Sequence, residues 1–160
     1  MTIKMLLTWL AATIGLMVGI TFLFYKAEQP PTNQAVSNGA KAVVDITSKN
    51  VGTISVDSEQ TTEFNLSNSG VKPLKVLKIS SSCNCTFGQF IYEGKESVEY
   101  GMHAPSGYLG EIAPGKNAKI RMIYRPKIMP VYGAVTRDLY ITTNDPINPK
   151  LTFSMSAKVE

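Results

Sequence analysis

Two kinds of hydrophobic pattern divide this chain. Residues 5–25 form one apolar run without a charged side chain, whereas from residue 41 onward apolar and polar residues alternate in short segments. The clearest alternation covers residues 151–159, where every second side chain is apolar. A period of two is the signature of a half-buried β-strand. Residues 64–67, 120–125 and 139–142 follow the same pattern.

Turn-forming sequences separate these strand segments, which are bounded by Asn68-Ser69-Gly70, Ala113-Pro114-Gly115-Lys116 and Asn144-Asp145-Pro146. Gly70 is expected to supply positive φ in a hairpin, and Pro114-Gly115 is typical of a type II turn. No window after residue 27 keeps a helical apolar period over three turns. Residues 41–160 are therefore predicted to form an all-β domain, a sandwich or small barrel.

The run at residues 5–25 is long enough to span a membrane, because about 20 apolar residues in a helix cross the hydrocarbon core. Lys4 and Lys26 bracket it, and Trp9 and Tyr25 suit the two interfaces. A cleaved signal peptide is the alternative interpretation. Its nearest cleavage site, Tyr25-Lys26-Ala27, has a bulky ring where a small residue is needed, so residues 1–25 are predicted to be an uncleaved anchor.

Residues 26–40 contain Pro30-Pro31 and Asn38-Gly39 and almost nothing apolar, which is typical of a spacer. The net charge of +4 adds little information about partners. Without Lys4 and Lys26, 14 of the 16 basic residues remain against 12 acidic ones, a net charge of +2. No clustered basic face or nucleic-acid-binding motif is present, so nucleic acid is not an expected partner.

Enzymatic motifs are absent: the sequence has no G-x-S-x-G elbow, no H-E-x-x-H, no phosphate loop and no dinucleotide fingerprint. A Cys-His nucleophilic pair would need a cysteine against His103, the only histidine, and no third residue to orient it is evident. The chain is therefore predicted not to be an enzyme, and no small-molecule substrate is evident.

Five short motifs follow one another in a specific order, at residues 50–54, 62–76, 82–86, 112–116 and 143–146. This order resembles the bacterial family called domain of unknown function 1573. Its members read, in outline, D-F-G-x-I, F-x-N-x-G-x-x-P-L, S-C-G-C-T, I-x-P-G-x and T-N-D-P. The resemblance covers nearly everything from residue 43 to residue 160. It departs from the family at Asn84, which replaces the usual glycine between the cysteines.

The family is similar to the abnormal-spindle, hydin and major-sperm-protein group, which implies an immunoglobulin-like β-sandwich of about seven strands. Family members commonly carry export signals, which implies a domain outside the cytoplasm. The resemblance implies no reaction. The stretch between the cysteine motif and Pro114 is about twice the length expected of the family, so residues 88–110 are predicted to be an insertion, either a surface hairpin or a docking element.

Cys83-Asn84-Cys85 is the one feature that suggests chemistry. In an extended segment the two Cα atoms would lie about 6.6 Å apart, close to the limit for a disulfide. A bridge would need a kinked backbone and would be strained and easily reduced. The pair is interpreted first as structural, either as thiols or as a local disulfide. Two thiolates could instead bind Cu(I), with Met102 and His103 as further ligands, or exchange disulfides with a partner.

The sequence therefore predicts a single-pass protein of a bacterial inner membrane, with its C-terminal domain outside the cytoplasm. The domain is expected to bind another envelope or inner-membrane protein, as an assembly module or accessory subunit, through edge strands and the 88–110 insertion. The alternative hypothesis is a Cu(I)-binding or thiol-redox protein acting through Cys83 and Cys85.

Overall fold

The computed structural model describes residues 3–5, 9, 13–17 and 39–160. Residues 3–5, 9 and 13–17 are helical. Among these described residues, no helix is both long enough and apolar enough to cross a membrane. Most of the predicted anchor at 1–25 and of the predicted linker at 26–40 lies outside the described residues, so both stay predictions.

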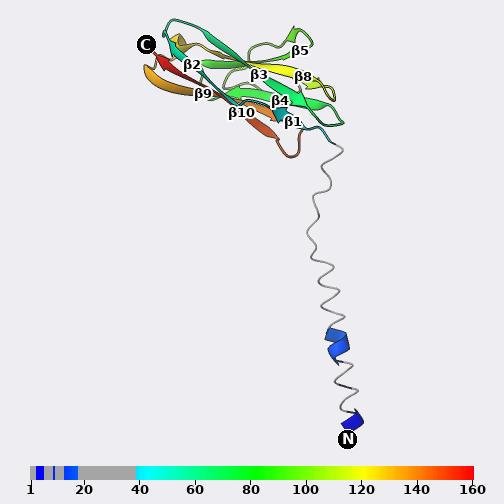
Figure 1. Cartoon of the computed structure of the whole chain (residues 1–160). Coiled ribbons are helices and arrows are strands. Elements are labelled where there is room, and N and C mark those ends of the chain that lie inside the picture. Colours follow the sequence, from blue (N-terminus) through cyan, green and yellow to red (C-terminus); the bar gives the residue numbers. More distant parts are fainter. Residues whose placement is uncertain (1–2, 6–8, 10–12, 18–38) are drawn as a thin grey trace. The chain divides into compact units, whose positions relative to one another are not determined.

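Residues 39–160 form an all-β domain with ten strands and one short 3-10 helix, η1 (Figure 1). The strands of one sheet, in spatial order, are β1 (Ala42–Val44), β3 (Gln60–Asn68), β8 (Asn117–Tyr124), β5 (Thr86–Tyr92) and β6 (Lys95–Glu96). Those of the other are β2 (Ser48–Ile54), β10 (Lys150–Val159), β9 (Gly133–Thr143), β4 (Leu74–Ser81) and β7 (Gly110–Ile112). All pairs are antiparallel except β2 with β10, which is parallel.

The predicted all-β sandwich is confirmed, but the expected count of about seven strands is too low. Three of the ten strands, β1, β6 and β7, have only three, two and three residues. So few residues show no recognisable alternation. Each of the three lies at a sheet edge, where a short strand leaves few unpaired backbone groups exposed.

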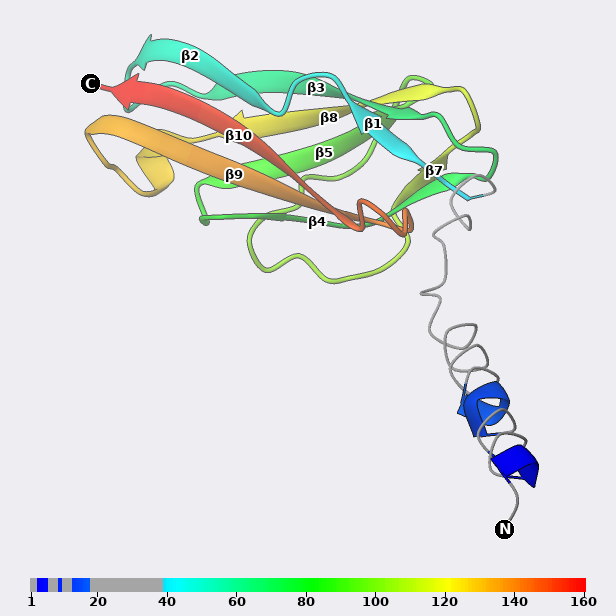
Figure 2. The ribbon, with the colours of Figure 1, turned by 60° about the horizontal axis from the view of Figure 1, so that its bottom comes forward.

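The core lies between the two sheets, which face one another (Figure 2). Phe64 of β3 and Phe153 of β10 meet across it, with ring centroids 4.9 Å apart. The residues that alternate in the sequence form this layer, since the inward side chains of the long strands are almost fully buried. They include Leu66, Ile120, Met122, Ile79, Leu139, Ile141 and Met155.

One end of the sandwich receives the chain at Gly39 and is called the entry end here; it comprises loops 69–73, 113–116 and 144–149. Buried Asn68, the last residue of β3, joins two of these loops, because its side-chain amide donates to the Lys72 and Ile112 carbonyls. Asp145 accepts a hydrogen bond of 2.8 Å from the Ala42 backbone N–H. Three of the five motifs therefore hold this end together.

Gly70 corrects an expectation from the sequence. Its φ is not positive, and the segment it belongs to joins β3 to β4, which lie in different sheets, so it is not a hairpin turn. A Cβ at this position would lie 2.3 Å from the Gly39 carbonyl oxygen and 2.6 Å from the Lys41 nitrogen. Gly70 is needed because two backbones approach closely. Gly115, by contrast, has φ +72°, as the predicted type II turn requires.

The opposite end, called the disulfide end here, comprises loops 55–59, 82–85 and 125–132. Short contacts bring these loops together: the Arg125 backbone N–H donates to the Cys85 carbonyl at 2.8 Å, and its side chain donates to Glu59 at 2.6 Å. Figure 2 shows the two ends on opposite sides of the domain, with β1 near one and the start of β9 at the other. Within the domain, the disulfide end therefore points away from the place where the chain enters.

The predicted insertion at 88–110 begins within β5, which continues to Tyr92. Beyond it, β6 turns back along β5, and Tyr100 makes paired backbone hydrogen bonds of 2.9 Å with Gly88. The segment then reaches the other sheet, where Leu109 N–H donates to the Val76 carbonyl before β7 pairs with β4. Residues 88–110 thus link the edges of both sheets, and their status as an insertion stays a prediction.

Candidate functional site

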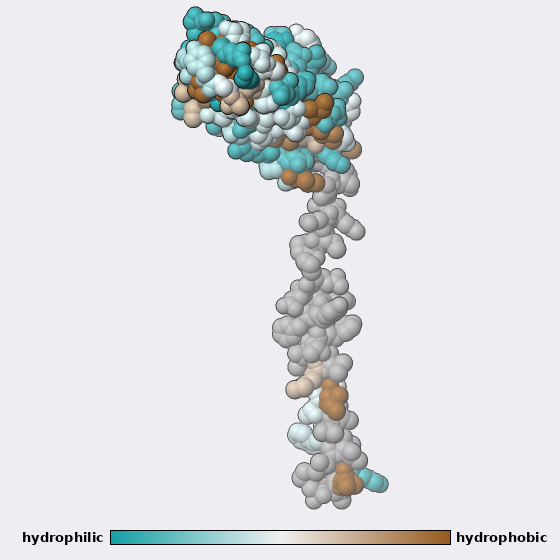
Figure 3. Space-filling model, turned by 60° about the vertical axis from the view of Figure 1, so that its left-hand side comes forward, coloured by the Kyte–Doolittle hydropathy of each residue, from teal (hydrophilic) through white to brown (hydrophobic). Residues whose placement is uncertain are grey.

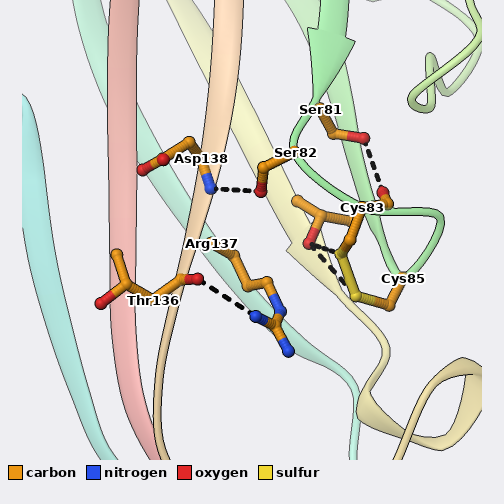
Figure 4. Close-up of a disulfide and its surroundings, with 8 residues drawn as sticks. Ser81, Ser82, Cys83, Cys85, Thr136, Arg137 and Asp138 are labelled. Carbon is orange, nitrogen blue, oxygen red and sulfur yellow. Dashed lines mark hydrogen bonds between the residues drawn. A yellow bond between two sulfur atoms is a disulfide. The ribbon is translucent and has the colours of Figure 1, made fainter.

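Cys83 and Cys85 form a disulfide in the turn between β4 and β5, where the chain crosses from one sheet to the other (Figure 4). Their Cα atoms are 5.3 Å apart, closer than in an extended segment, because the backbone turns at residues 82–85. The kink that the sequence required for a bridge is therefore present. Ser81 Oγ donates to the Cys83 carbonyl at 2.8 Å, which fixes the turn to the end of β4.

The two sulfurs differ in their surroundings. Cys85 is fully buried, whereas Cys83 is half-buried. The hydroxyl of buried Thr86 lies 3.2 Å from Cys83 Sγ and 3.9 Å from Cys85 Sγ, so one hydroxyl contacts both sulfurs. Of the two residues, Cys83 is therefore the one that has surface open to solvent.

A positive charge lies near this disulfide. Arg137 of β9 shares the inner face of its strand with Val135 and Leu139, and Figure 4 shows its guanidinium beside the two cysteines. The guanidinium carbon lies 5.2 Å from the centre of the Tyr124 ring, and one N–H donates to the Thr136 carbonyl at 3.2 Å. Within residues 39–160, no carboxylate pairs with Arg137 and its buried Nε has no hydrogen-bond acceptor.

Tyr124 adds a second unsatisfied donor to the same interior. Its side chain is fully buried, and among the described residues its hydroxyl has no hydrogen-bond partner. Tyr124 lies directly opposite Thr86 in the β5–β8 pair, so both side chains are on the inner face of the sheet. Buried polar groups usually have a partner, and two without one beside a disulfide mark an unusual polar environment.

The four predicted metal ligands lie in two places. Cys83 and Cys85 are bonded to each other, while Met102 and His103 are exposed in the insertion. Among the described residues, no three His, Cys, Asp or Glu side chains are placed to hold a metal ion. Because soft metals bind thiolates, the predicted Cu(I) site would require reduction of the disulfide and stays a prediction.

The loop between η1 (Pro126–Ile128) and β9 forms an exposed apolar segment at the disulfide end. Its residues, called the apolar loop here, are Ile128, Met129, Pro130, Val131 and Tyr132, all of them exposed. Tyr132 has 67% of its surface exposed and the other large side chains between 45% and 49%. Figure 3, which brings the left-hand side of Figure 1 forward, shows brown apolar residues interrupting a mostly hydrophilic surface.

Charged residues flank the apolar loop. Lys127 pairs with Asp57 at 3.0 Å, and Arg125 pairs with Glu59 and Glu99, each at 2.6 Å. The hydrogen bonds from Arg125 lower the pKa of Glu99, although partial burial opposes this shift. A groove of about 300 Å³ lies between these groups, lined by Asp57, Ser58, Glu59, Arg125, Lys127 and Ile128. The apolar loop thus has a rim in which both signs of charge are already paired.

Tyr132 is one of several tyrosines that the sequence offers as candidates for an interface, but neither the continuous apolar loop nor Arg137 was expected. A usable signal for the loop was present: five consecutive apolar residues with a central proline cannot form an inner strand, because proline cannot donate to the ladder. Such a run without a strand must be exposed or cover another surface. Arg137 gave no signal, since an arginine within an alternating strand is expected on the outer face.

Residues 42–104 match the family described as "Protein of unknown function (DUF1573)", which confirms the resemblance drawn from the motif order. The matched segment includes the disulfide turn and ends within the insertion. No curated protein matches the chain in sequence.

Solved structures share the fold. The match to a protein of unknown function from Porphyromonas gingivalis W83 covers 82% of this chain and 51% of that protein's chain, with a TM-score of 0.59 and 16% sequence identity. A family 123 glycoside hydrolase from Clostridium perfringens matches 76% of this chain with 27% of its own, at TM-score 0.52 and 13% identity. The match to an ASH/PapD-like domain of human CEP192 covers 82% of this chain and 92% of that domain's chain, with a TM-score of 0.48 and 18% sequence identity.

This chain therefore spans about half of the Porphyromonas protein and a smaller part of the hydrolase. At such identities, the matches to the Porphyromonas protein and to the hydrolase show a shared fold and nothing about activity.

Proposed function

We propose that this chain, whose residues 42–104 match the DUF1573 family, is an extracytoplasmic protein-binding module that docks a partner protein at its disulfide end. The observation that carries the proposal is the apolar loop, Ile128–Tyr132. Contiguous exposed apolar residues with a polar rim are typical of interaction sites, because water is a poor solvent for such a patch. Tyr132 and Met129 belong to residue types enriched in interfaces.

A folded protein suits this surface better than a lipid bilayer. Loops that enter a membrane interface usually carry cations that can reach anionic headgroups. Here Lys127 and Arg125 are already paired with carboxylates on neighbouring loops. The loop also lies at the end of the domain opposite to Gly39, where the chain enters.

Two observations support a position outside the cytoplasm. The Cys83–Cys85 disulfide fits an oxidising compartment, since such bonds are rare where thiol reductants are maintained. The uncharged run at residues 5–25 fits an anchor in the bacterial inner membrane. An anchored domain has a raised effective concentration for a partner in the same membrane, as expected of an accessory subunit.

Site-specific crosslinking in the producing cells tests the proposal with the full chain. A photoreactive residue is placed at Met129 or Tyr132, and in matched controls at Val71 or Ile147, which lie at the entry end and have exposed fractions within the same range. We expect one protein adduct at positions 129 and 132 and none at the control positions. With that partner purified, Tyr132→Ser should weaken binding by about 30-fold, as for an aromatic residue at the centre of an interface.

Equal crosslinking at both ends of the domain would contradict the proposal. So would adducts at positions 129 and 132 that consist only of lipid or of a second copy of this chain. A Val71→Ser variant should bind the purified partner as the unaltered chain does, which separates loss of the site from a general effect of removing an exposed apolar side chain.

A further inference from the structure

We propose that the Cys83–Cys85 disulfide is a thiol–disulfide exchange site that accepts two electrons from a pair of cysteine thiols in another protein. The inference rests on the surroundings of the disulfide and is independent of the apolar loop. Three features carry it: the unequal exposure of the two cysteine residues, the hydroxyl that contacts both sulfurs, and the unpaired donors of Arg137 and Tyr124.

The exposure of the sulfurs determines which one reacts first. An attacking thiolate must approach along the sulfur–sulfur axis, and it can reach only a sulfur with an open face. Cys83 is half-buried in an exposed turn, flanked by exposed Ser82 and Asn84, whereas Cys85 is fully buried. Cys83 is therefore the sulfur that is attacked, and Cys85 is the leaving group.

The leaving sulfur becomes a thiolate in the interior, so its charge needs stabilising groups. Thr86 supplies a hydroxyl 3.9 Å from Cys85 Sγ and 3.2 Å from Cys83 Sγ. Arg137 supplies a positive charge that no carboxylate within residues 39–160 neutralises. A nearby cation lowers the pKa of a thiol and makes it a better leaving group.

The unsatisfied donors fit the reduced state better than the oxidised one. In the disulfide form, neither Tyr124 Oη nor Arg137 Nε has an acceptor among the described residues. A disulfide sulfur is a weak acceptor, whereas a thiolate is a strong one. Donors left without partners by the disulfide are thus available to the charge that appears when it opens.

The exchange then balances in two steps. A thiolate of the partner attacks Cys83 Sγ, a mixed disulfide forms between them, and the electron pair of the broken bond goes to Cys85 Sγ. In the second step, the partner's other cysteine thiolate attacks the partner sulfur that is bonded to Cys83, and Cys83 is released as a thiolate. The partner leaves with a disulfide, and this chain holds two thiols after taking up the two protons.

The first experiment compares the two sulfurs one at a time in the full chain, with oxidised glutathione as the probe. Cys85→Ala leaves Cys83, and Cys83→Ala leaves Cys85. We expect Cys83 to form the mixed disulfide at least roughly tenfold faster, in keeping with its exposure. Circular dichroism shows whether each variant is folded. Equal rates in two folded variants, or a faster Cys85, would overturn the proposal.

The second experiment measures the ratio of dithiol to disulfide at equilibrium in glutathione buffers, in chains that keep both cysteines. Arg137→Gln should lower this ratio roughly tenfold, because one charge near the thiolate is lost. Arg137→Lys keeps the charge and should restore most of the ratio. Arg121→Gln, on the outer face of the sheet, is the matched control and should leave it unchanged.

If Arg137→Gln has the same ratio as Arg121→Gln, Arg137 is a structural residue and the proposal fails. A disulfide that resists excess dithiothreitol in the folded chain would also overturn it. If Tyr132→Ser abolishes binding of the partner but leaves the exchange with glutathione unchanged, the exchange site functions independently of the docking site.

Discussion

At the scale of single residues, Asp145 shows how a motif residue holds the domain together. It has 1% of its surface exposed, and it accepts hydrogen bonds of 2.8 Å from the backbone N–H groups of Ala42 and Ile147. Burial raises the pKa of its carboxyl, but these bonds and that from Asn148 outweigh burial, so the pKa lies below its ordinary value of 3.8. The charged form is therefore the one that stabilises the fold.

Asp145→Asn should destabilise the domain by about 2 kcal/mol at pH 7, because an amide NH₂ replaces an oxygen that accepts from a buried N–H. The pKa of Asp145 is lower in the folded chain than in the unfolded chain. Its contribution to stability is therefore fully present above pH 3.8 and is lost as the pH falls through the pKa of the folded state. Urea unfolding of the unaltered and variant chains should thus differ most at neutral pH and converge below about pH 4. Glu111→Gln, at an exposed carboxylate, is the control. A difference that grows on acidification would contradict this account.

The prediction for Gly70 concerns steric space, whereas that for Asp145 concerns charge. In Gly70→Ala the new Cβ would meet backbone atoms of Gly39, Ala40 and Lys41 at 2.3 to 2.9 Å, and backbone cannot rotate away as a side chain can. We expect a loss of about 1–3 kcal/mol in the free energy of unfolding, typical of overpacking. Gly107→Ala, where a Cβ meets nothing, should change stability little. Equal effects of the two substitutions in thermal unfolding would disprove the packing role of Gly70.

At the scale of elements, the turn 82–85 connects the two sheets, and its disulfide closes a loop of only three residues. In the chain-entropy account a loop this short stabilises the fold by about 1.5 kcal/mol, near the low end for disulfides. Hydrogen bonds from Ser81 and Arg125 already fix the turn. The bond is thus not required to hold the two sheets together.

Replacing both cysteines with alanine should therefore lower stability by only about 1–3 kcal/mol, from the lost loop closure and the removal of buried sulfur. The variant should keep the β-rich circular dichroism spectrum and the same partner at the apolar loop. Chemical unfolding measures the loss, and the crosslinker at Tyr132 measures the binding. An unfolded double variant at room temperature would mean that the disulfide is essential for folding.

The elements differ in how far their sequences revealed them. Strands β8 and β10 alternate over eight and ten residues, so the burial of one face of each strand follows from the amino-acid pattern alone. β6 has two residues, and its position depends on pairing with Tyr92 and Ile91 of β5, which no local pattern encodes. The site was less predictable: the C-x-C pair was visible, but its proximity to Arg137 depends on the pairing of β4 with β9, which are far apart in the sequence.

At the scale of the whole molecule, four of the five motifs separate into two groups. Those at residues 62–76, 112–116 and 143–146 meet at the entry end, where Asn68 and Asp145 bind backbone groups of other loops. The cysteine motif lies at the other end with the apolar loop. Hydrogen bonds between loops that are far apart in the sequence explain the first group. The second group has exposed apolar side chains and a disulfide that the fold itself does not need.

The full chain should remain in the membrane fraction after carbonate washing, because residues 5–25 carry no charge and lack a usable cleavage site. Immunoblotting of the fractions measures this, and a chain that begins at Ser37 serves as the control that should be released. A native N-terminus near Ala27 or Glu28, found by N-terminal sequencing, would instead show that the segment is a cleaved export signal.

The opposite positions of the two ends have a mechanical consequence. If a tether pulls on the chain before Gly39 while a partner grips the apolar loop, the load runs along the strands instead of across them. β1 then slides past β3, and its three residue pairs, the Ala42–Asp145 bond and the bonds to the Gly39 carbonyl are strained together instead of one after another. Resistance to force depends on the unfolding rate under load, so such simultaneous loading would make the domain slow to unfold when it is pulled from these two points.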